Sequence, residues 1–156
     1  MFIMEIERKF LAKEIPFCLS EYPSAMISQY YISFSPTIRI RQSNKDYFLT
    51  VKGKGHIARE EFEIPLTKEQ YQSLQKKCDM PPIMKTRYFV PLDNHLTAEI
   101  DIYKGDIDGL ITIEVEFDTE ELAYSFIPPN WFGKDVSLDH RYKNTSLCLY
   151  GIPKTI

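Results

Sequence analysis

Short runs in which polar and apolar residues alternate dominate the chain, and these runs are rich in aromatic and β-branched side chains. Alternation with a period of two is typical of half-buried β-strands, and so is this composition. Turn-forming segments such as Ser43-Asn44-Lys45-Asp46 separate the runs. Eight strands are therefore predicted, over Phe2–Leu11, Ala25–Ser33, Thr37–Ser43, Asp46–Lys52, Ala58–Pro65, Ile83–Val90, His95–Tyr103 and Leu110–Phe117.

Helical patterns are few and short. Thr67 and Gln70 have the spacing of a capping box, and Thr119 precedes a pair of glutamates that favours the first turn of a helix. The expected fold class is α+β, with a mainly antiparallel sheet that can close on itself as a barrel. The predicted helices cover Phe17–Tyr22, Lys68–Lys77, Glu120 to about Phe126, and about Tyr142 to Tyr150.

The composition is that of an ordinary globular domain, with 44% hydrophobic and 26% charged residues. A chain of 156 residues has the length of one domain, so a single domain over residues 1–156 is expected. The 19 basic and 22 acidic residues give a net charge of −3, which argues against a nonspecific nucleic-acid binder. The three scattered cysteines and the lack of a leader or a membrane-length apolar stretch predict a cytoplasmic protein without a membrane partner.

Charged residues recur two positions apart on nearly every predicted strand. Side chains two positions apart share a face of a strand, so the sheet has an ionic face and an apolar face. A solvated outer face is the simplest interpretation, but the short helices need an apolar surface to pack on. The ionic face is therefore expected to line the inside of a barrel. Its charged residues are Glu5, Glu7, Lys9, Arg39, Arg41, Arg59, Glu61, Glu63, Lys85, Arg87, Glu99, Asp101, Glu114 and Glu116.

Acids and bases gathered in one lumen indicate a particular chemistry. Clustered carboxylates suit Mg²⁺ or Mn²⁺, which keep coordination sites for water and phosphate oxygens. Arginine and lysine side chains suit phosphate oxygens. Both together are typical of phosphoryl transfer, in which catalysis consists mostly of positioning and charge neutralisation.

The charged motifs resemble those of a known family. Glu5-Ile6-Glu7-Arg8-Lys9 is similar to the N-terminal Glu-x-Glu-x-Lys motif of the CYTH superfamily, also called triphosphate tunnel metalloenzymes. The ordered series that follows covers essentially the whole chain and makes the resemblance specific. It comprises Gln29-x-Tyr31, Arg39-Ile40-Arg41, Thr50-Val51-Lys52-Gly53, Arg59-Glu60-Glu61-Phe62-Glu63, Lys85-x-Arg87, Glu99-x-Asp101, Glu114-Val115-Glu116 and Tyr142-Lys143-Asn144.

The resemblance implies an eight-stranded antiparallel closed β-barrel, with a few short helices packed outside, that hydrolyses a triphosphate with Mg²⁺ or Mn²⁺. It implies metal ligation by Glu5, Glu7 and Glu116, with Glu114 and Asp101 close to the metal or its waters. The phosphate chain would be held by Arg39, Arg41, Lys52, Lys85 and Arg87, with Arg59 and Lys143 as additions. Glu61, Glu63 and Glu99 would be supporting acids, and Lys9 would supply positive charge near the scissile bond. Because acids and bases are equal in number in this set, salt bridges across an empty tunnel are expected.

Several activities occur within this family. Hydrolysis of inorganic tripolyphosphate to pyrophosphate and phosphate is favoured, because the short chain leaves little length for a base-binding pocket. The alternatives are class IV adenylate cyclase-like cyclisation of ATP, hydrolysis of nucleoside or thiamine triphosphate, and noncatalytic binding of polyphosphate. Retention of Glu5, Glu7, Glu114 and Glu116 favours an enzyme over a binding module. The oligomeric state is left open.

Overall fold

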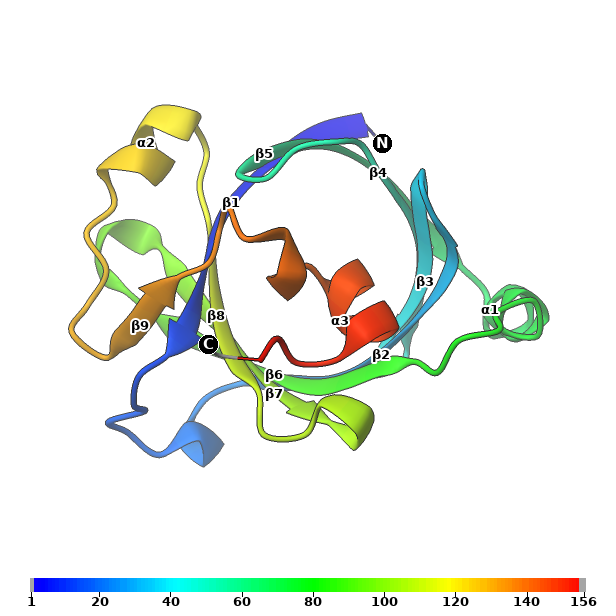
Figure 1. The fold of residues 1–156 in the computed structure, drawn as a ribbon, viewed down its shortest axis with the longest axis horizontal. Coiled ribbons are helices and arrows are strands. Elements are labelled where there is room, and N and C mark those ends of the chain that lie inside the picture. The colour runs from blue at the N-terminus through cyan, green and yellow to red at the C-terminus, as the bar shows by residue number, and fades with distance from the viewer. Residues whose placement is uncertain (1, 155–156) are drawn as a thin grey trace.

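The structure, a computed structural model, describes residues 2–154 and contains a closed antiparallel β-barrel (Figure 1). Its strands are β1 (Phe2–Ala12), β2 (Ser24–Phe34), β3 (Thr37–Ser43), β4 (Asp46–Lys52), β5 (Ala58–Leu66), β6 (Ile83–Pro91), β7 (Thr97–Lys104) and β8 (Ile111–Glu116). They are ordered β5-β4-β3-β2-β6-β7-β8-β1, and pairing of β5 with β1 closes the sheet. The predicted strands and the predicted closure are confirmed.

A ninth strand, β9 (Phe132–Asp135), pairs with the end of β1 and was not predicted. It is only four residues long. Its Gly133 lies against β1 so closely that an added Cβ atom would be 2.7 Å from the Leu11 carbonyl oxygen. The neighbouring Trp131 packs edge-on against Phe132, at 4.5 Å between ring centroids, on the outside of the barrel. Trp131 therefore packs the loop before β9 onto the barrel.

Two helices cover the outer surface, as expected. Helix α1 (Lys68–Gln75) begins with the predicted capping box, in which the Thr67 hydroxyl accepts from the Gln70 backbone N–H and the Gln70 side chain accepts from the Thr67 N–H. Its buried Tyr71 packs against outer tyrosines of β2 and β4. Helix α2 (Glu120–Ser125) covers a core of outward-facing side chains from β1, β7 and β8. Single 3₁₀ turns lie at Leu19–Glu21, Asp93–His95, Gly105–Ile107 and His140–Tyr142.

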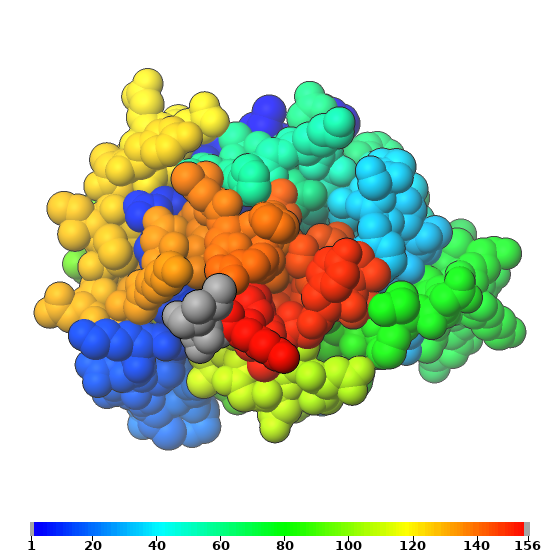
Figure 2. All heavy atoms as spheres, viewed as in Figure 1, coloured from blue at the N-terminus to red at the C-terminus, as the bar shows by residue number. Residues whose placement is uncertain are grey.

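The C-terminal helix α3 (Asn144–Tyr150) differs from the expectation, because it lies across one end of the barrel and not on its outer wall (Figure 1). Leu147 is 1% exposed and packs with Tyr31, Ile83 and Tyr103, which point inward from β2, β6 and β7. In the space-filling view, residues near the C-terminus fill this end of the barrel (Figure 2). The lumen is thus apolar at one end, where it receives α3, and ionic beyond it.

Among residues 2–154, no helix is long and apolar enough to cross a membrane.

Candidate active site

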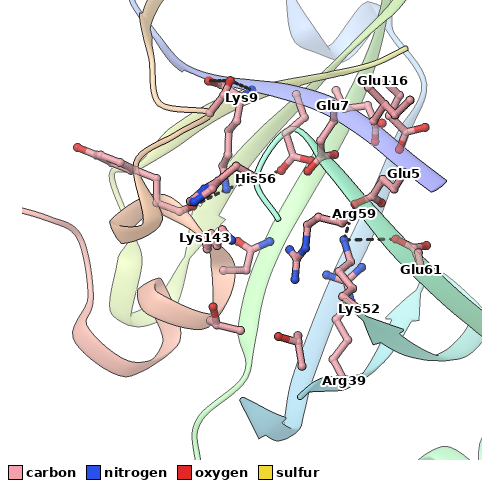
Figure 3. A pocket seen from close by; sticks show the side chains of 18 of the residues that line it. Glu5, Glu7, Lys9, Arg39, Lys52, His56, Arg59, Glu61, Glu116 and Lys143 are labelled. Atoms are coloured by element: carbon pink, nitrogen blue, oxygen red, sulfur yellow. Dashed lines mark hydrogen bonds and ion pairs between the residues drawn. The ribbon is translucent and has the colours of Figure 1, made fainter. Parts of the chain in front are cut away.

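A cavity of about 460 Å³ occupies the ionic part of the lumen (Figure 3). Every site residue predicted from the sequence lines it except Asp101. Strand alternation places residues i and i+2 on the inner face, and register brings the strands' charges together. On β1 and β8, for example, Glu7 lies opposite Glu116 and Lys9 lies opposite Glu114.

Three carboxylates form the acidic part of the cavity. One oxygen from each of Glu5, Glu7 and Glu116 lies within 4.8 Å of the others. Burial, followed by the negative charges of Glu114 and Glu5, raises the pKa of Glu7 well above its usual value. Loss of hydration in the tunnel, followed by the charges of Glu99 and Glu5, raises the pKa of Glu116 to about 7. Glu5 is an exception: burial opposes its ionisation, but the charge of Lys52 together with hydrogen bonding to Glu61 and Lys52 lowers the pKa of Glu5 to about 2.

These carboxylates together lack positive charge, as the raised pKa values of Glu7 and Glu116 indicate. A group of close oxygen donors with excess negative charge is the donor set that Mg²⁺ and Mn²⁺ prefer. The residues present therefore fit a divalent cation.

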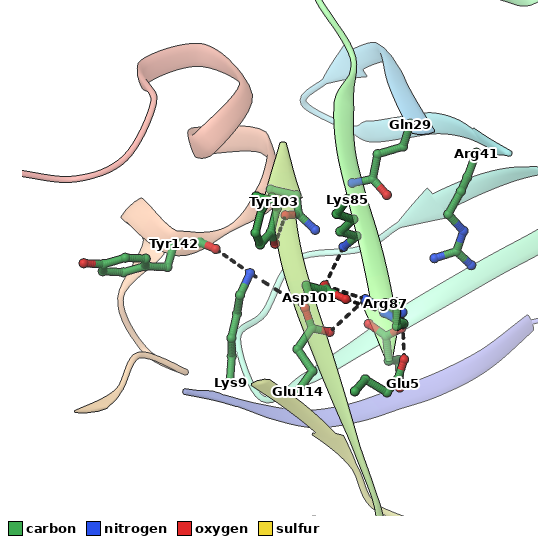
Figure 4. A network of polar contacts seen from close by, with 12 residues as sticks. Glu5, Lys9, Gln29, Arg41, Lys85, Arg87, Asp101, Tyr103, Glu114 and Tyr142 are labelled. Carbon is green, nitrogen blue, oxygen red and sulfur yellow. Dashed lines mark hydrogen bonds and ion pairs between the residues drawn. The ribbon is translucent and has the colours of Figure 1, made fainter. Parts of the chain in front are cut away.

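Salt bridges line the lumen, but those among the described residues join adjacent or next-but-one strands along its wall and do not cross it as expected (Figure 4). On the wall formed by β6 and β7, Lys85 and Arg87 converge on Asp101. The Lys85 ammonium lies 2.8 Å from an Asp101 oxygen, and Arg87 binds the same carboxylate through Nε at 2.7 Å and Nη2 at 2.9 Å. Arg87 also contacts Glu99 at 2.7 Å. Lys52 lies 2.8 Å from Glu5, outside this wall.

Other cations have no such partner. Among the described residues, Arg39, Arg59 and Lys143 have no carboxylate oxygen within 4.0 Å. Arg59 and Lys143 instead donate to the backbone carbonyls of Gly53, at 3.1 Å, and Gly55, at 2.6 Å. The cavity therefore combines an acidic cluster, of which Glu7 and Glu116 have no salt-bridge partner among the described residues, with bases that have none either.

Repulsion among the bases also indicates that this part of the cavity lacks negative charge. Burial, followed by the charges of Arg39 and Arg87, lowers the pKa of Arg41 to about 10. The Nε atoms of Arg39 and Arg41 are buried and have no hydrogen-bond acceptor among the described residues. A polyanion in the cavity would supply the missing acceptors and relieve this repulsion.

Comparison with known proteins yields close relatives of one kind, although no family model matches the chain. The chain is 38% identical over 149 residues to an inorganic triphosphatase from Nitrosomonas europaea, with 93% of this chain and 97% of the relative covered. It is 34% identical over 148 residues to an inorganic triphosphatase from Acetivibrio thermocellus, with 92% of each chain covered. The chain belongs to the CYTH family of triphosphatases. A crystal structure of an inorganic triphosphatase superimposes on this CYTH chain with a TM-score of 0.70 at 35% identity, covering 97% of this chain and 98% of that one.

One expected metal-site residue of this CYTH protein lies elsewhere. Asp101 is fully buried, does not line the cavity, and has both oxygens bound by Arg87 and Lys85. It faces Arg87 across the β6–β7 ladder, two residue pairs away from Glu99. The structure therefore places Asp101 behind the bases, where it orients them, and away from the carboxylate group of Glu5, Glu7 and Glu116.

Glu114 lies between the two sets of charges. Its carboxylate is 3.7 Å from Lys9 Nζ and 3.9 Å from Arg87 Nη2. Although burial opposes ionisation, the charges of Lys9, Arg87 and Lys85 hold the pKa of Glu114 well below its usual value. Its role close to the metal stays a prediction of the CYTH resemblance.

Several groups at the CYTH tunnel were not assigned a role from the sequence. The Tyr142 carbonyl oxygen accepts from Lys9 Nζ at 2.6 Å, and backbone carbonyls carry no sequence signal. Thr50 is fully buried and donates to Glu63 at 2.9 Å, so a small polar residue supports a lumenal acid. The Gln29-x-Tyr31 motif was recognised in the sequence, but no role was assigned to its residues.

Proposed function

We propose that the protein hydrolyses inorganic tripolyphosphate to pyrophosphate and phosphate inside the tunnel, with Mg²⁺ or Mn²⁺ as cofactor. The observation that carries the proposal is the cavity itself, which holds a carboxylate cluster within 4.8 Å beside bases without carboxylate partners. The two inorganic triphosphatases to which the chain is similar support this choice of substrate. We further propose a cytoplasmic location, consistent with the three free cysteines.

The carboxylates of Glu5, Glu7 and Glu116 would hold the divalent cation. A cation at this position supplies Lewis acidity to the phosphate oxygens. The raised pKa values of Glu7 and Glu116 favour the protonated forms of these carboxyl groups. Binding of the cation would therefore release their protons.

The bases divide the work of binding the phosphate chain. Arg39, Arg59 and Lys143 have no carboxylate oxygen within 4.0 Å among the described residues, so we assign them the strongest phosphate contacts. Arg41, Lys52, Lys85 and Arg87 line the same cavity and complete the cradle. Their acids, Glu61, Glu63 and Glu99, also line the cavity and would keep these side chains oriented when no substrate is bound.

Lys9 is proposed to stabilise charge near the scissile bond. Its ammonium is fixed between the Tyr142 carbonyl oxygen, at 2.6 Å, and Glu114, at 3.7 Å. It extends from the same face of β1 as Glu5 and Glu7, so it lies next to the cation site. A fixed positive charge at this place would stabilise the phosphoryl group as it is transferred to water.

The experiment measures phosphate release from tripolyphosphate, ATP and thiamine triphosphate with Mg²⁺, Mn²⁺ or EDTA, together with cyclic AMP formation from ATP. We expect tripolyphosphate to have the highest kcat/KM, with activity abolished by EDTA. Cyclic AMP as the main product from ATP would replace the proposal with a cyclase. Binding of tripolyphosphate without turnover of any substrate would replace it with a binding module. Glu60→Gln, which alters an exposed acid next to Glu61, is the matched control and should keep full activity.

A further inference from the structure

One edge of β1 changes its partner next to Lys9. Pairing with β5 ends at Ile6, and pairing with β9 begins at Phe10. Between these two residues, the backbone of Lys9 is bound by the chain that follows β9. The Lys9 N–H donates to the Ser137 hydroxyl oxygen at 2.9 Å, and the Val136 N–H donates to the Lys9 carbonyl oxygen at 2.9 Å. Both backbone polar groups of Lys9 are therefore held by the same short segment.

The hydroxyl of Ser137 is oriented by Asp135. One carboxylate oxygen of Asp135 accepts from the Ser137 hydroxyl at 2.5 Å and from the Ser137 N–H at 2.8 Å. The Lys9 carbonyl oxygen, at 3.3 Å from the hydroxyl, is a more distant acceptor. Because a serine hydroxyl has one hydrogen and this one points to Asp135, a lone pair of the oxygen is left to accept from the Lys9 N–H. Ser137 thus attaches its segment to β1 through an acceptor of fixed direction.

The segment Val136–Lys143 then returns to the side chain of the same lysine. It contains two consecutive turns, in which the Asp139 N–H donates to the Val136 carbonyl at 3.0 Å and the Tyr142 N–H donates to the Asp139 carbonyl at 3.1 Å. These turns bring the Tyr142 carbonyl oxygen to 2.6 Å from Lys9 Nζ (Figure 4). One segment therefore binds Lys9 at its backbone and at its ammonium group.

We propose that Ser137 is a positioning residue, which fixes this segment on the Lys9 backbone and thereby places the Tyr142 carbonyl oxygen that holds the Lys9 ammonium. A shift of the segment along β1 would move that carbonyl, and the ammonium with it, relative to the phosphate group being transferred. This inference rests on the proposed function, which assigns Lys9 to the scissile bond.

The first test is Ser137→Ala, which removes the hydroxyl while the bond from the Val136 N–H to the Lys9 carbonyl keeps the segment attached. Loss of one hydrogen bond should lower the kcat for tripolyphosphate about two- to tenfold. The KM should stay within about twofold, because Lys9 acts on the transition state. Ser137→Thr keeps the hydroxyl and should restore kcat. The matched control is Ser125→Ala, which removes an exposed hydroxyl that donates to a carbonyl in α2 at 3.2 Å and should leave kcat unchanged.

A double-mutant cycle tests whether Ser137 acts through Lys9. In a Lys9→Met background, Ser137→Ala should no longer change the residual kcat. An equal fold-change in both backgrounds would overturn the inference. So would a fall in Tm of the Ser137→Ala variant with kcat unchanged, since the role of the hydroxyl would then be purely structural.

NMR of the Lys9 ammonium group gives a measurement that needs no turnover. Its signal is assigned by its loss in Lys9→Met. The contact with the Tyr142 carbonyl should slow exchange of the ammonium hydrogens with water, and Ser137→Ala should accelerate this exchange about threefold or more. Equal exchange rates in the two proteins would overturn the inference even if tripolyphosphate is hydrolysed. A wild-type protein that fails to hydrolyse tripolyphosphate would refute the proposed function, while the exchange rates would still decide the role of Ser137.

Discussion

Asp101→Asn should act on stability and not on metal binding. The Asp101 carboxylate and the Lys85 side chain are 0% and 1% exposed, and three charge-assisted contacts of 2.7 to 2.9 Å join Asp101 to Lys85 and Arg87. Burial, followed by the charge of Arg87, already lowers the pKa of Lys85 to about 8 in the presence of Asp101. An asparagine keeps the shape of the side chain and removes the charge that compensates both bases.

Breaking a buried ion pair on one side costs about 3–5 kcal/mol, because an uncompensated charge stays buried. For a domain of this size, that cost corresponds to a fall in Tm of about 6–20 °C. The measurements are urea unfolding and calorimetric titration with Mn²⁺. We expect a large loss in the free energy of unfolding and an Mn²⁺ affinity within about threefold of the wild-type value. The control is Asp135→Asn, since Asp135 forms a partly exposed pair with Arg8 at 2.8 Å and should cost about 1 kcal/mol or less.

The opposite result would refute this reasoning. If Asp101→Asn abolished Mn²⁺ binding and changed stability by less than about 1 kcal/mol, Asp101 would be a metal ligand, as the family resemblance implied, and the arrangement of the β6–β7 wall would be misjudged.

Further outcomes follow from the same charges. Glu7→Gln and Glu116→Gln should each weaken Mn²⁺ binding by tenfold or more and abolish cation-dependent turnover while the fold is kept. Mn²⁺ titration measures the binding and circular dichroism checks the fold. Wild-type activity in these variants would place the cation elsewhere. Arg41→Ala should chiefly raise the KM for tripolyphosphate and also lower kcat, and steady-state kinetics with both parameters unchanged would exclude Arg41 from the site. In EDTA, the free energy of unfolding should fall as the pH rises from about 5 to 7.5. Burial and the hydrogen bond to Glu5 raise the pKa of Glu61 to about 7, and the pKa of Glu116 is also raised. The folded state therefore binds more protons than the unfolded state in this pH range. Mg²⁺ should reverse this fall, and flat stability across the same pH range, measured by urea unfolding, would contradict the raised pKa values.

The alternation of polar and apolar residues predicted the barrel well, because each strand of the barrel turns one face to the lumen and the other to the outside. A lumen lined by charges and an outer face that carries apolar residues give every strand a period of two, which Glu5 and Glu7 or Arg39 and Arg41 display directly. The position of α3 was not predicted, although a signal existed. Tyr31 and Tyr103 occupy ionic-face positions near the ends of their strands, and apolar residues there indicate that something apolar enters the lumen.

Other features had weaker signals. Strand β9 is too short for a period to be recognised, and its pairing depends on the close approach of Gly133 to β1. The contact between Lys9 and the Tyr142 carbonyl joins residues 133 positions apart through a backbone atom, so no side-chain pattern could indicate it. For Asp101, residue type and spacing predicted a place on the ionic face correctly but not its depth, which depends on the shear of the closed sheet.

Burial and pairing separate the tunnel charges into two groups that a count of acids and bases cannot distinguish. On β6 and β7, Lys85, Arg87 and Asp101 neutralise one another and form a wall whose charges are largely satisfied without a ligand. Elsewhere in the lumen, Glu7 and Glu116 of the proposed cation site and the bases Arg39, Arg59 and Lys143 have no salt-bridge partner among the described residues, although Lys52 pairs with Glu5. A cation bound to triphosphate supplies both missing charges at once, whereas either ligand alone leaves one group uncompensated. The two ligands should therefore bind cooperatively, and substitutions in the wall should affect mainly stability while substitutions in the second group affect mainly binding.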